Sequence, residues 1–134
     1  MIDCLIIGDS IAVGTKMFRP ECAEYAKVGI TSVGWNKKFG NNDLSAETVI
    51  IGLGTNDWPS IDTYSMLMNI RSKIKSNSRV FWILPNNESR PLITHQVLEV
   101  STQFNDTVLP NTKWEKDKIH PTSMGYKELA EKTK

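Results

Sequence analysis

An unbroken apolar run, Val49–Leu53 (VIIGL), lies near the middle of the chain and carries no polar side chain. A strand of this kind is typical of a parallel sheet that helices cover on both faces. A second run, Val80–Leu84 (VFWIL), has the same character and is ended by Pro85. Two such strands predict an α/β protein rather than a protein of helices or of strands alone.

Outward from these two strands, short apolar runs alternate with longer amphipathic stretches. We expect strands at Ile2–Gly8, Glu24–Val28, Thr48–Gly54 and Arg79–Leu84, with a weaker fifth at Lys113–Trp114. Apolar residues at helical spacing predict helices over Ser60–Ser76, with Ser60 as a possible cap, Pro91–Phe104 and Ser123–Lys132. The alternation predicts a three-layer α/β/α sandwich around a central, mostly parallel five-stranded sheet.

Length and composition favour one domain over residues 1–134, because no linker, repeat or low-complexity tract divides the sequence. The formal net charge is +1, and the lysines are scattered rather than gathered in a basic stripe. We therefore expect neither nucleic acid nor a membrane surface as a partner. Composition does not predict the oligomeric state.

The amino-terminal segment favours a protein that is not exported. The first expected strand begins at Ile2, which leaves no room for the basic, apolar and small-residue regions of a signal peptide. No apolar run reaches the roughly 18 residues that a membrane span needs. We expect a cytoplasmic or otherwise non-secreted location.

Two cysteines, Cys4 and Cys22, are too few for a disulfide framework. We expect both to be reduced, buried thiols, with Cys4 in the core of the first strand.

Right-handed crossovers place the loops that follow parallel strands at one edge of the sheet, where ligands usually bind. The first such loop, Gly8–Gly14 (GDSIAVG), carries Ser10. The backbone N–H of Ser10 would lie at the positive end of the next helix, which suits a developing oxyanion. By itself, however, a serine in this position is more often an ordinary helix cap.

Two further loops carry polar groups toward the same edge. The segment Gly52–Pro59 (GLGTNDWP) contains Asn56, whose neutral amide can donate hydrogen bonds there, although such residues also cluster in ordinary turns. In Asp117–Pro121 (DKIHP), the carboxylate can accept from one ring nitrogen of His120 while the other nitrogen faces a hydroxyl. We expect no metal site, since His95 is the only other histidine and the cysteines lack ligand spacing.

Taken in order, Gly8–Ser10 (GDS), Gly54–Asp57 (GTND) and Asp117–Pro121 (DKIHP) resemble the first, third and fifth signature blocks of the SGNH/GDSL hydrolase family. The second block contributes a glycine and is matched more loosely. Gly29 is the candidate, and Gly34 competes with it.

The resemblance implies a flavodoxin-like strand order 2-1-3-4-5 and a serine esterase without a cofactor. Ser10 would be the nucleophile, His120 the base and Asp117 the residue that orients the base. The oxyanion hole would consist of the N–H groups of Ser10 and Gly29 and the side-chain amide of Asn56.

The expected substrate is a small acyl ester, with acetyl on a carbohydrate as the leading candidate. Trp35, Trp58 and Trp114 flank the proposed site and either stack on a sugar or pack in the interior, whereas Trp82 is expected in the core. Asp9 is expected to brace the serine loop. A catalytically silent binding or structural module, and a lysophospholipase or thioesterase of the same family, remain as alternatives.

Overall fold

In the computed structural model, which describes residues 2–134, five parallel strands form one sheet in the order β2-β1-β3-β4-β5. The strands are β1 (Ile2–Gly8), β2 (Ala23–Ala26), β3 (Ala46–Gly52), β4 (Arg79–Ile83) and β5 (Thr107–Leu109). The predicted sandwich and its strand order are confirmed, and every strand pair of this sheet is parallel.

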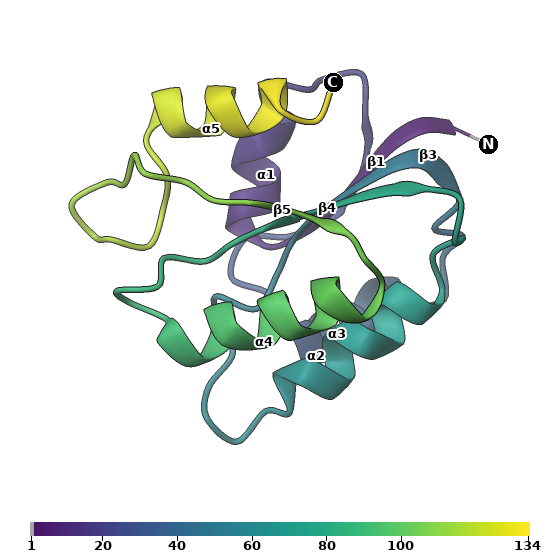
Figure 1. The fold of residues 1–134 in the computed structure, drawn as a ribbon, viewed down its shortest axis with the longest axis horizontal. Coiled ribbons are helices and arrows are strands. Elements are labelled where there is room, and N and C mark those ends of the chain that lie inside the picture. Colours follow the sequence, from purple (N-terminus) through teal and green to yellow (C-terminus); the bar gives the residue numbers. More distant parts are fainter. Residues whose placement is uncertain (1) are drawn as a thin grey trace.

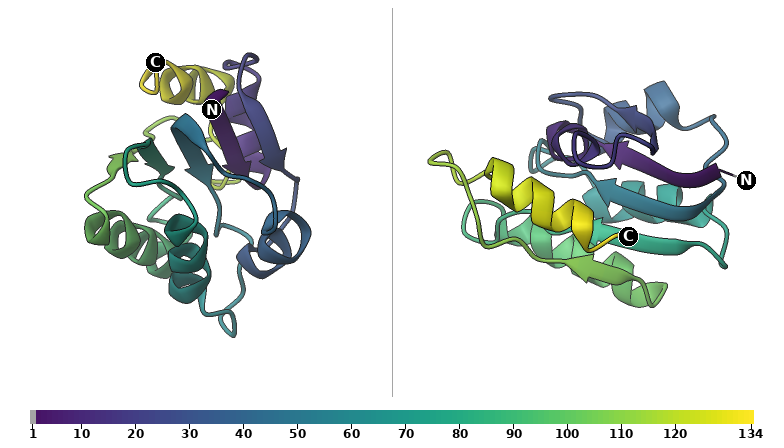
Figure 2. Two further views of the ribbon diagram at one scale, coloured as in Figure 1. Left: turned by 90° about the vertical axis from the view of Figure 1, so that its right-hand side faces the viewer. Right: turned by 90° about the horizontal axis from the view of Figure 1, so that it is seen from above.

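Helices cover both faces of the sheet (Figures 1 and 2). One face carries α1 (Ser10–Lys16) and α5 (Ser123–Glu131), and the other carries α2 (Ser32–Phe39), α3 (Thr63–Ser72) and α4 (Pro91–Gln103). None of the helices in residues 2–134 has the length and apolar character to cross a membrane.

Alternate side chains of the central strands enter two separate cores. Leu5 and Ile7 of β1 belong to the core beneath α2, α3 and α4, whereas Ile6 packs in the core beneath α1 and α5. In β3, Val49 and Ile50 divide between the two cores in the same way. Since both faces of these strands are buried, their runs contain almost no polar residue.

The fifth strand and helix α3 differ most from the prediction, while the bounds of β2, β3, β4, α4 and α5 differ by one or two residues at one or both ends. The fifth strand is Thr107–Leu109, which pairs with β4, while Trp114 forms only an isolated antiparallel bridge with Pro121. The expected strand at Lys113–Trp114 was therefore wrong, because its extended backbone belongs to a loop and the real strand is too short to show a pattern. Helix α3 begins after Asp62, which caps it by accepting from the N–H of Ser65 at 3.1 Å.

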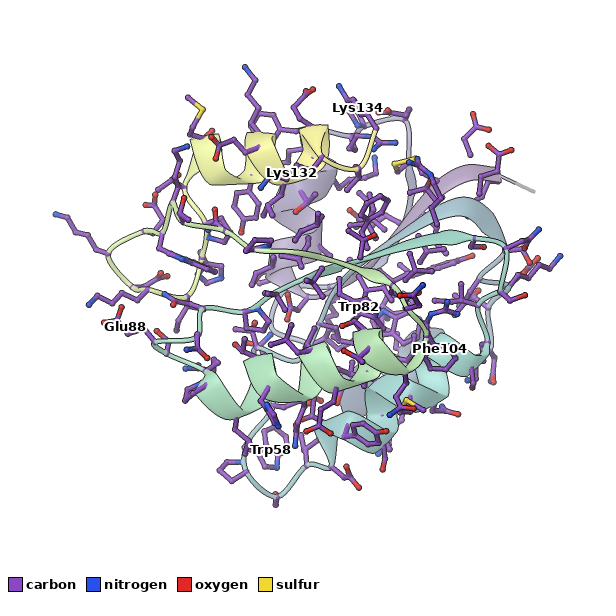
Figure 3. The ribbon with its side chains drawn as sticks, viewed as in Figure 1. Trp58, Trp82, Glu88, Phe104, Lys132 and Lys134 are labelled. Atoms are coloured by element: carbon purple, nitrogen blue, oxygen red, sulfur yellow. A yellow bond between two sulfur atoms is a disulfide. The ribbon has the colours of Figure 1, made fainter. Side chains whose placement is uncertain are left out.

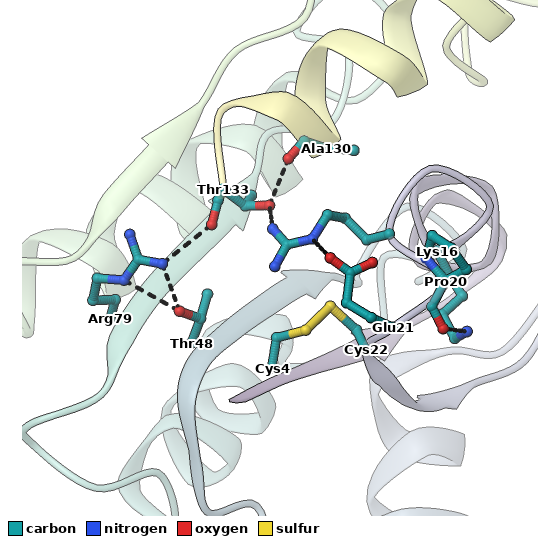
Figure 4. The surroundings of a disulfide bond; sticks show 10 residues. Cys4, Lys16, Pro20, Glu21, Cys22, Thr48, Arg79, Ala130 and Thr133 are labelled. Atoms are coloured by element: carbon teal, nitrogen blue, oxygen red, sulfur yellow. Dashed lines mark hydrogen bonds and ion pairs between the residues drawn. A yellow bond between two sulfur atoms is a disulfide. The ribbon is translucent and has the colours of Figure 1, made fainter. Parts of the chain in front are cut away.

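The expectation of two reduced thiols was also wrong, because Cys4 and Cys22 form a disulfide (Figure 4). Parallel pairing of β1 with β2 places Leu5 beside Ala23, so the preceding residues of the two strands meet, with Cα atoms 4.8 Å apart. Cys4 is buried, as expected. Disulfides are rare in cytosolic proteins, so the bond lends no support to a cytoplasmic location, which stays a prediction.

Candidate active site

Loops that follow the strands bring a residue from the first part of the sequence close to one from the last part. Ser10 begins α1 directly after β1, and His120 lies in the loop before α5. The Oγ atom of Ser10 is 2.9 Å from Nε2 of His120, although 110 positions separate the two residues in the sequence. The predicted meeting of this hydroxyl and this imidazole is therefore present in the structure.

Asp117 holds the imidazole from its other side. Its Oδ2 atom is 2.7 Å from Nδ1 of His120, and its Oδ1 atom accepts from the backbone N–H groups of Ile119 and His120 at 2.9 and 3.0 Å. The hydrogen bond from the imidazole, helped by these N–H groups, lowers the pKa of Asp117 to about 2. An ionised Asp117 fixes the proton of His120 on Nδ1 and leaves Nε2 to face the serine.

The loop between β4 and α4 supports the histidine loop. Lys118 has a positive φ of 58°, and its carbonyl oxygen accepts from Nδ2 of Asn86 at 2.9 Å and from Oγ of Ser89 at 2.6 Å. On the surface, the Lys118 ammonium also pairs with Glu88, which Figure 3 labels on this loop. The sequence suggested no role for residues 86–90. Their bonds to Lys118 join positions about 30 residues apart, and a local sequence pattern does not show such contacts.

Asp9 braces the serine loop, as predicted. It caps α1 by accepting from the N–H of Ile11 at 2.9 Å, and its own N–H donates to the carbonyl of Gly52 at 2.8 Å. This approach requires Gly8, since a Cβ atom there would lie 1.8 Å from the Gly52 oxygen. Burial raises the pKa of Asp9 to about 7, and its Oδ2 atom has no hydrogen-bond partner within residues 2–134.

Asn56 lies against the loop that carries the second-block glycine. Its Nδ2 atom donates to the carbonyl of Ile30 at 3.1 Å. The neighbouring Asp57 accepts from the N–H and hydroxyl of Ser32 at 2.7 and 2.6 Å and from the hydroxyl of Thr63 at 2.6 Å. Asp57 thus ties the Asn56 loop to the start of α2, a positioning role that sequence analysis did not identify.

The two competing glycines occupy different environments. Gly34 lies inside α2, where its N–H donates to the capping hydroxyl of Thr31 at 3.0 Å. Gly29 lies in the exposed loop before Ile30, with a φ of 81° that favours glycine. The N–H of Gly34 is therefore already used by its helix cap.

The four tryptophans divide into interior and surface residues. Trp35 and Trp82 are buried, and their indole N–H groups donate to the Tyr25 carbonyl and to Asp106, so Trp82 is confirmed in the core and Trp35 is excluded from sugar contact. Trp114 is half-buried and bonds within its own loop. Trp58 is exposed beside Asn56.

The candidate site is open to solvent. The side chains of His120 and Asp117 are 42% and 46% exposed, so the imidazole and carboxylate are accessible from outside. Across residues 2–134, no cluster of three or more histidine, cysteine, aspartate and glutamate side chains is arranged to hold a metal ion.

The sequence matches no family model and no curated protein. Solved structures are similar in fold. The C-terminal catalytic domain of peptidoglycan O-acetyltransferase A (OatA) of Streptococcus pneumoniae, solved with a methylsulfonyl adduct, aligns with a TM-score of 0.62 at 15% identity, over 97% of this chain and 89% of that one. A proposed acylhydrolase of Bacteroides fragilis NCTC 9343 aligns with a TM-score of 0.63 at 16% identity, over 98% of this chain and 83% of that one.

These similarities cover nearly the whole chain and agree with the three-layer α/β/α fold that the sequence predicted. At this level of identity they concern the fold. Function therefore has to be argued from the site itself, where a hydroxyl, an imidazole and a carboxylate form one hydrogen-bonded series.

Proposed function

We propose that this protein is a serine esterase that hydrolyses small acyl esters. The observation that carries the proposal is the continuous series from Ser10 through His120 to Asp117, with contacts of 2.9 and 2.7 Å. In enzymes of several unrelated folds, this arrangement activates a serine hydroxyl toward a carbonyl carbon. Similarity in fold to an acetyltransferase and to a proposed acylhydrolase agrees with acyl chemistry.

In the first half-reaction, Nε2 of His120 accepts the hydroxyl proton as Oγ of Ser10 bonds to the carbonyl carbon of the ester. Negative charge develops on the carbonyl oxygen, where the N–H groups of Ser10 and Gly29 and the amide of Asn56 would stabilise it. The tetrahedral intermediate collapses, the bond to the alcohol oxygen breaks, and His120 gives its proton to that oxygen. The alcohol leaves, and the acyl group remains esterified to Ser10.

In the second half-reaction, His120 accepts a proton from a water molecule as the water oxygen bonds to the acyl carbon. Collapse breaks the bond to Oγ of Ser10, which recovers its proton from His120, and the carboxylic acid leaves. Asp117 remains ionised throughout and stabilises the imidazolium that forms in each half-reaction.

Acetyl on a carbohydrate is the substrate we propose. The open site can receive an ester on a bulky alcohol, and the pneumococcal protein of similar fold is named for O-acetyl transfer involving peptidoglycan. That name also supports a second candidate, in which a sugar hydroxyl replaces water in the second half-reaction. Adding a non-acetylated sugar during turnover distinguishes the two, since transfer yields a new acetylated sugar and hydrolysis yields acetate.

The nucleophile is tested with Ser10→Ala and p-nitrophenyl acetate. We expect the variant to fold normally by circular dichroism and to lose at least about 10³-fold in kcat, because the remaining groups cannot form the acyl-enzyme. Ser123→Ala, which changes an exposed serine at the start of α5, serves as the control and should keep full activity.

A fluorophosphonate probe should label the wild type at Ser10. Labelling at another residue, or full hydrolysis by Ser10→Ala, would remove Ser10 from this role. A correctly folded wild type that neither reacts with the probe nor hydrolyses esters would favour the catalytically silent module instead.

A further inference from the structure

A cavity of about 520 Å³ adjoins the candidate site on the side of Asn56. It lies between the loop from β3 to α3, residues 55–61, and a second segment, residues 89–96, that joins the end of the β4–α4 loop to the start of α4. Figure 3 shows Trp58 on that loop, below α4. The volume is within the range of small-molecule sites and is far more than an acetyl group would fill. The cavity therefore suits the larger part of an ester substrate.

The outer wall of this cavity is apolar and exposed. Trp58 is 57% exposed and Leu92 is 60% exposed, and Pro59 and Pro91 also line the cavity. An indole offers a flat apolar surface that suits the apolar face of a ring. Such residues at the mouth of a cavity mark a place where a ligand is expected to cover them.

Gln96, which lines the cavity, has a side-chain oxygen that lacks a partner among the described residues. The Oε1 atom of Gln96 is buried, and no donor within residues 2–134 bonds to it. A buried acceptor without a hydrogen bond is unfavourable, so a ligand with an O–H or N–H group is preferred in the cavity, where the half-buried Gln96 side chain can turn its oxygen toward that group. A hydrocarbon chain could cover Trp58 and Leu92, but it would leave Gln96 unsatisfied.

Arg90 adds a rigid polar element beside Gln96. Its Nε atom donates to the carbonyl of Thr55 at 2.9 Å, and its Nη1 atom donates to the carbonyl of Ser89 at 3.1 Å. The bond to Thr55 joins the two walls of the cavity and helps to set its shape before a ligand arrives.

From these features we propose that the cavity is a sugar subsite, in which a hydroxylated ring stacks on Trp58 and donates a hydroxyl hydrogen to Gln96. The inference rests on the proposed function, since it assigns the cavity to the alcohol of the same ester. Ser89 supports this assignment because it lines the cavity and also donates to the Lys118 carbonyl, two residues from His120. His120 protonates the departing alcohol, so the alcohol must lie toward this side.

The kinetic test uses Trp58→Ala and Gln96→Leu with two substrates, methyl 6-O-acetylglucoside and p-nitrophenyl acetate. We expect the ratio of kcat/KM for the sugar ester to that for the aryl ester to fall about tenfold in Trp58→Ala. In Gln96→Leu the ratio should fall about three- to tenfold, the effect of one lost hydrogen bond. Trp58→Phe should restore most of the loss, since it keeps an aromatic ring.

Matched controls come from the same helix. Gln103→Leu and Leu98→Ala alter side chains of α4 that do not line the cavity, and they should leave the ratio unchanged. An unchanged ratio in both Trp58→Ala and Gln96→Leu would overturn the proposal. The proposal would also be overturned if Trp58→Ala lowered kcat/KM for p-nitrophenyl octanoate and not for the sugar ester, because the cavity would then hold an acyl chain.

A binding measurement separates this proposal from the proposed reaction. Methyl glucoside is titrated into Ser10→Ala, and the NMR signals of the Trp58 indole and the Gln96 side-chain amide are followed. Saturable shifts of both signals support the sugar subsite. If the wild type nevertheless hydrolyses no ester, only the proposed esterase activity is refuted. Hydrolysis of acetyl esters with no shift of either signal would refute only the subsite.

Discussion

Asp9 combines full burial with a position next to the proposed nucleophile. One of its oxygens caps α1, and the other has no partner among the described residues. Burial, which disfavours the charged form, raises its pKa from 3.8 to about 7 despite the attraction of His120. The carboxyl that orders the serine loop is thus largely protonated in mildly acidic solution.

This pKa predicts a pH-dependent term in stability. Below about pH 3.8 Asp9 is protonated in both states; between pH 3.8 and 7 it ionises first in the unfolded chain, so the folded state loses stability as the pH rises. Above pH 7 the loss is complete. Relative to Asp9→Asn, which cannot ionise, the wild type should lose up to about 4 kcal/mol of unfolding free energy between pH 4 and pH 8.

Urea unfolding of both proteins at pH 4 and pH 8 measures this difference. Asp3→Asn, at the exposed start of β1, is the control and should follow the wild type. If the unfolding free energies of Asp9→Asn and the wild type change by the same amount between pH 4 and pH 8, Asp9 does not titrate as stated.

Asn56 provides the second prediction at this scale. Its amide nitrogen is directed to the Ile30 carbonyl, beside the loop of Gly29. Asn56→Ala should lower kcat for p-nitrophenyl acetate about 10²- to 10³-fold with little change in KM, because an oxyanion donor acts mainly in the transition state. Asn87→Ala, an exposed residue in the loop before α4, is the matched control. A selective rise in KM would show that Asn56 binds substrate instead.

At the scale of residues, the sequence allowed Ser10, Asn56, Asp117 and His120 to be proposed because each lies in a short motif after an expected strand. The structure brings them to one edge of the sheet. The braces at Asn86, Ser89 and Asp57 could not be predicted. The bonds to Ser32 and to the Lys118 carbonyl join positions 25 to 32 residues apart, and only the packing of loops brings these residues into contact.

Among the elements, β1 and β2 are held together by more than their backbone ladder. The disulfide joins the start of β1 to the residue before β2 and closes a loop with a sequence separation of 18 that contains α1. The buried Arg19, three residues before Cys22, donates to the side chain of Thr133, which Figure 4 labels. The segment between β1 and β2 is therefore joined to β1 by a disulfide and to a residue near the carboxyl terminus by a hydrogen bond.

The disulfide predicts a redox-dependent stability. A closed loop of this size restricts the unfolded chain, so dithiothreitol should lower the unfolding free energy of the wild type by about 3 kcal/mol. The double variant Cys4→Ala/Cys22→Ala should be similarly destabilised and indifferent to dithiothreitol, which makes it the internal control. Two free thiols, titrated in the unfolded wild type without reductant, would show that the bond does not form.

The elements that sequence predicted best are the long, buried ones. The bounds of β1 match the prediction, and β4 and α4 differ from it by one residue at one end, because their apolar patterns are strong. The short edge strand β5 escaped prediction, since Thr107–Leu109 has no pattern of its own. The pairing of the cysteines depended on the register between strands, which single-sequence patterns do not contain.

For the whole molecule, the parallel sheet explains why distant residues meet. Every strand points the same way, so the loops that carry Ser10, Gly29 and Asn56 follow the adjacent strands β1, β2 and β3 at one edge. His120 reaches the same edge from the loop before α5. The meeting of these loops at one edge is a consequence of parallel strands joined by right-handed crossovers. It could be predicted from the sequence because the alternation of strands and helices indicates such a sheet.

The exposure of His120 and Asp117 has a kinetic consequence. In enzymes that close over their substrate, reopening to let products escape often limits turnover. Here the imidazole is already partly exposed to solvent, so water can enter and the carboxylic acid can leave without a movement of the chain. The slow event in each cycle should then be a bond-making step at the serine ester rather than a motion of the protein.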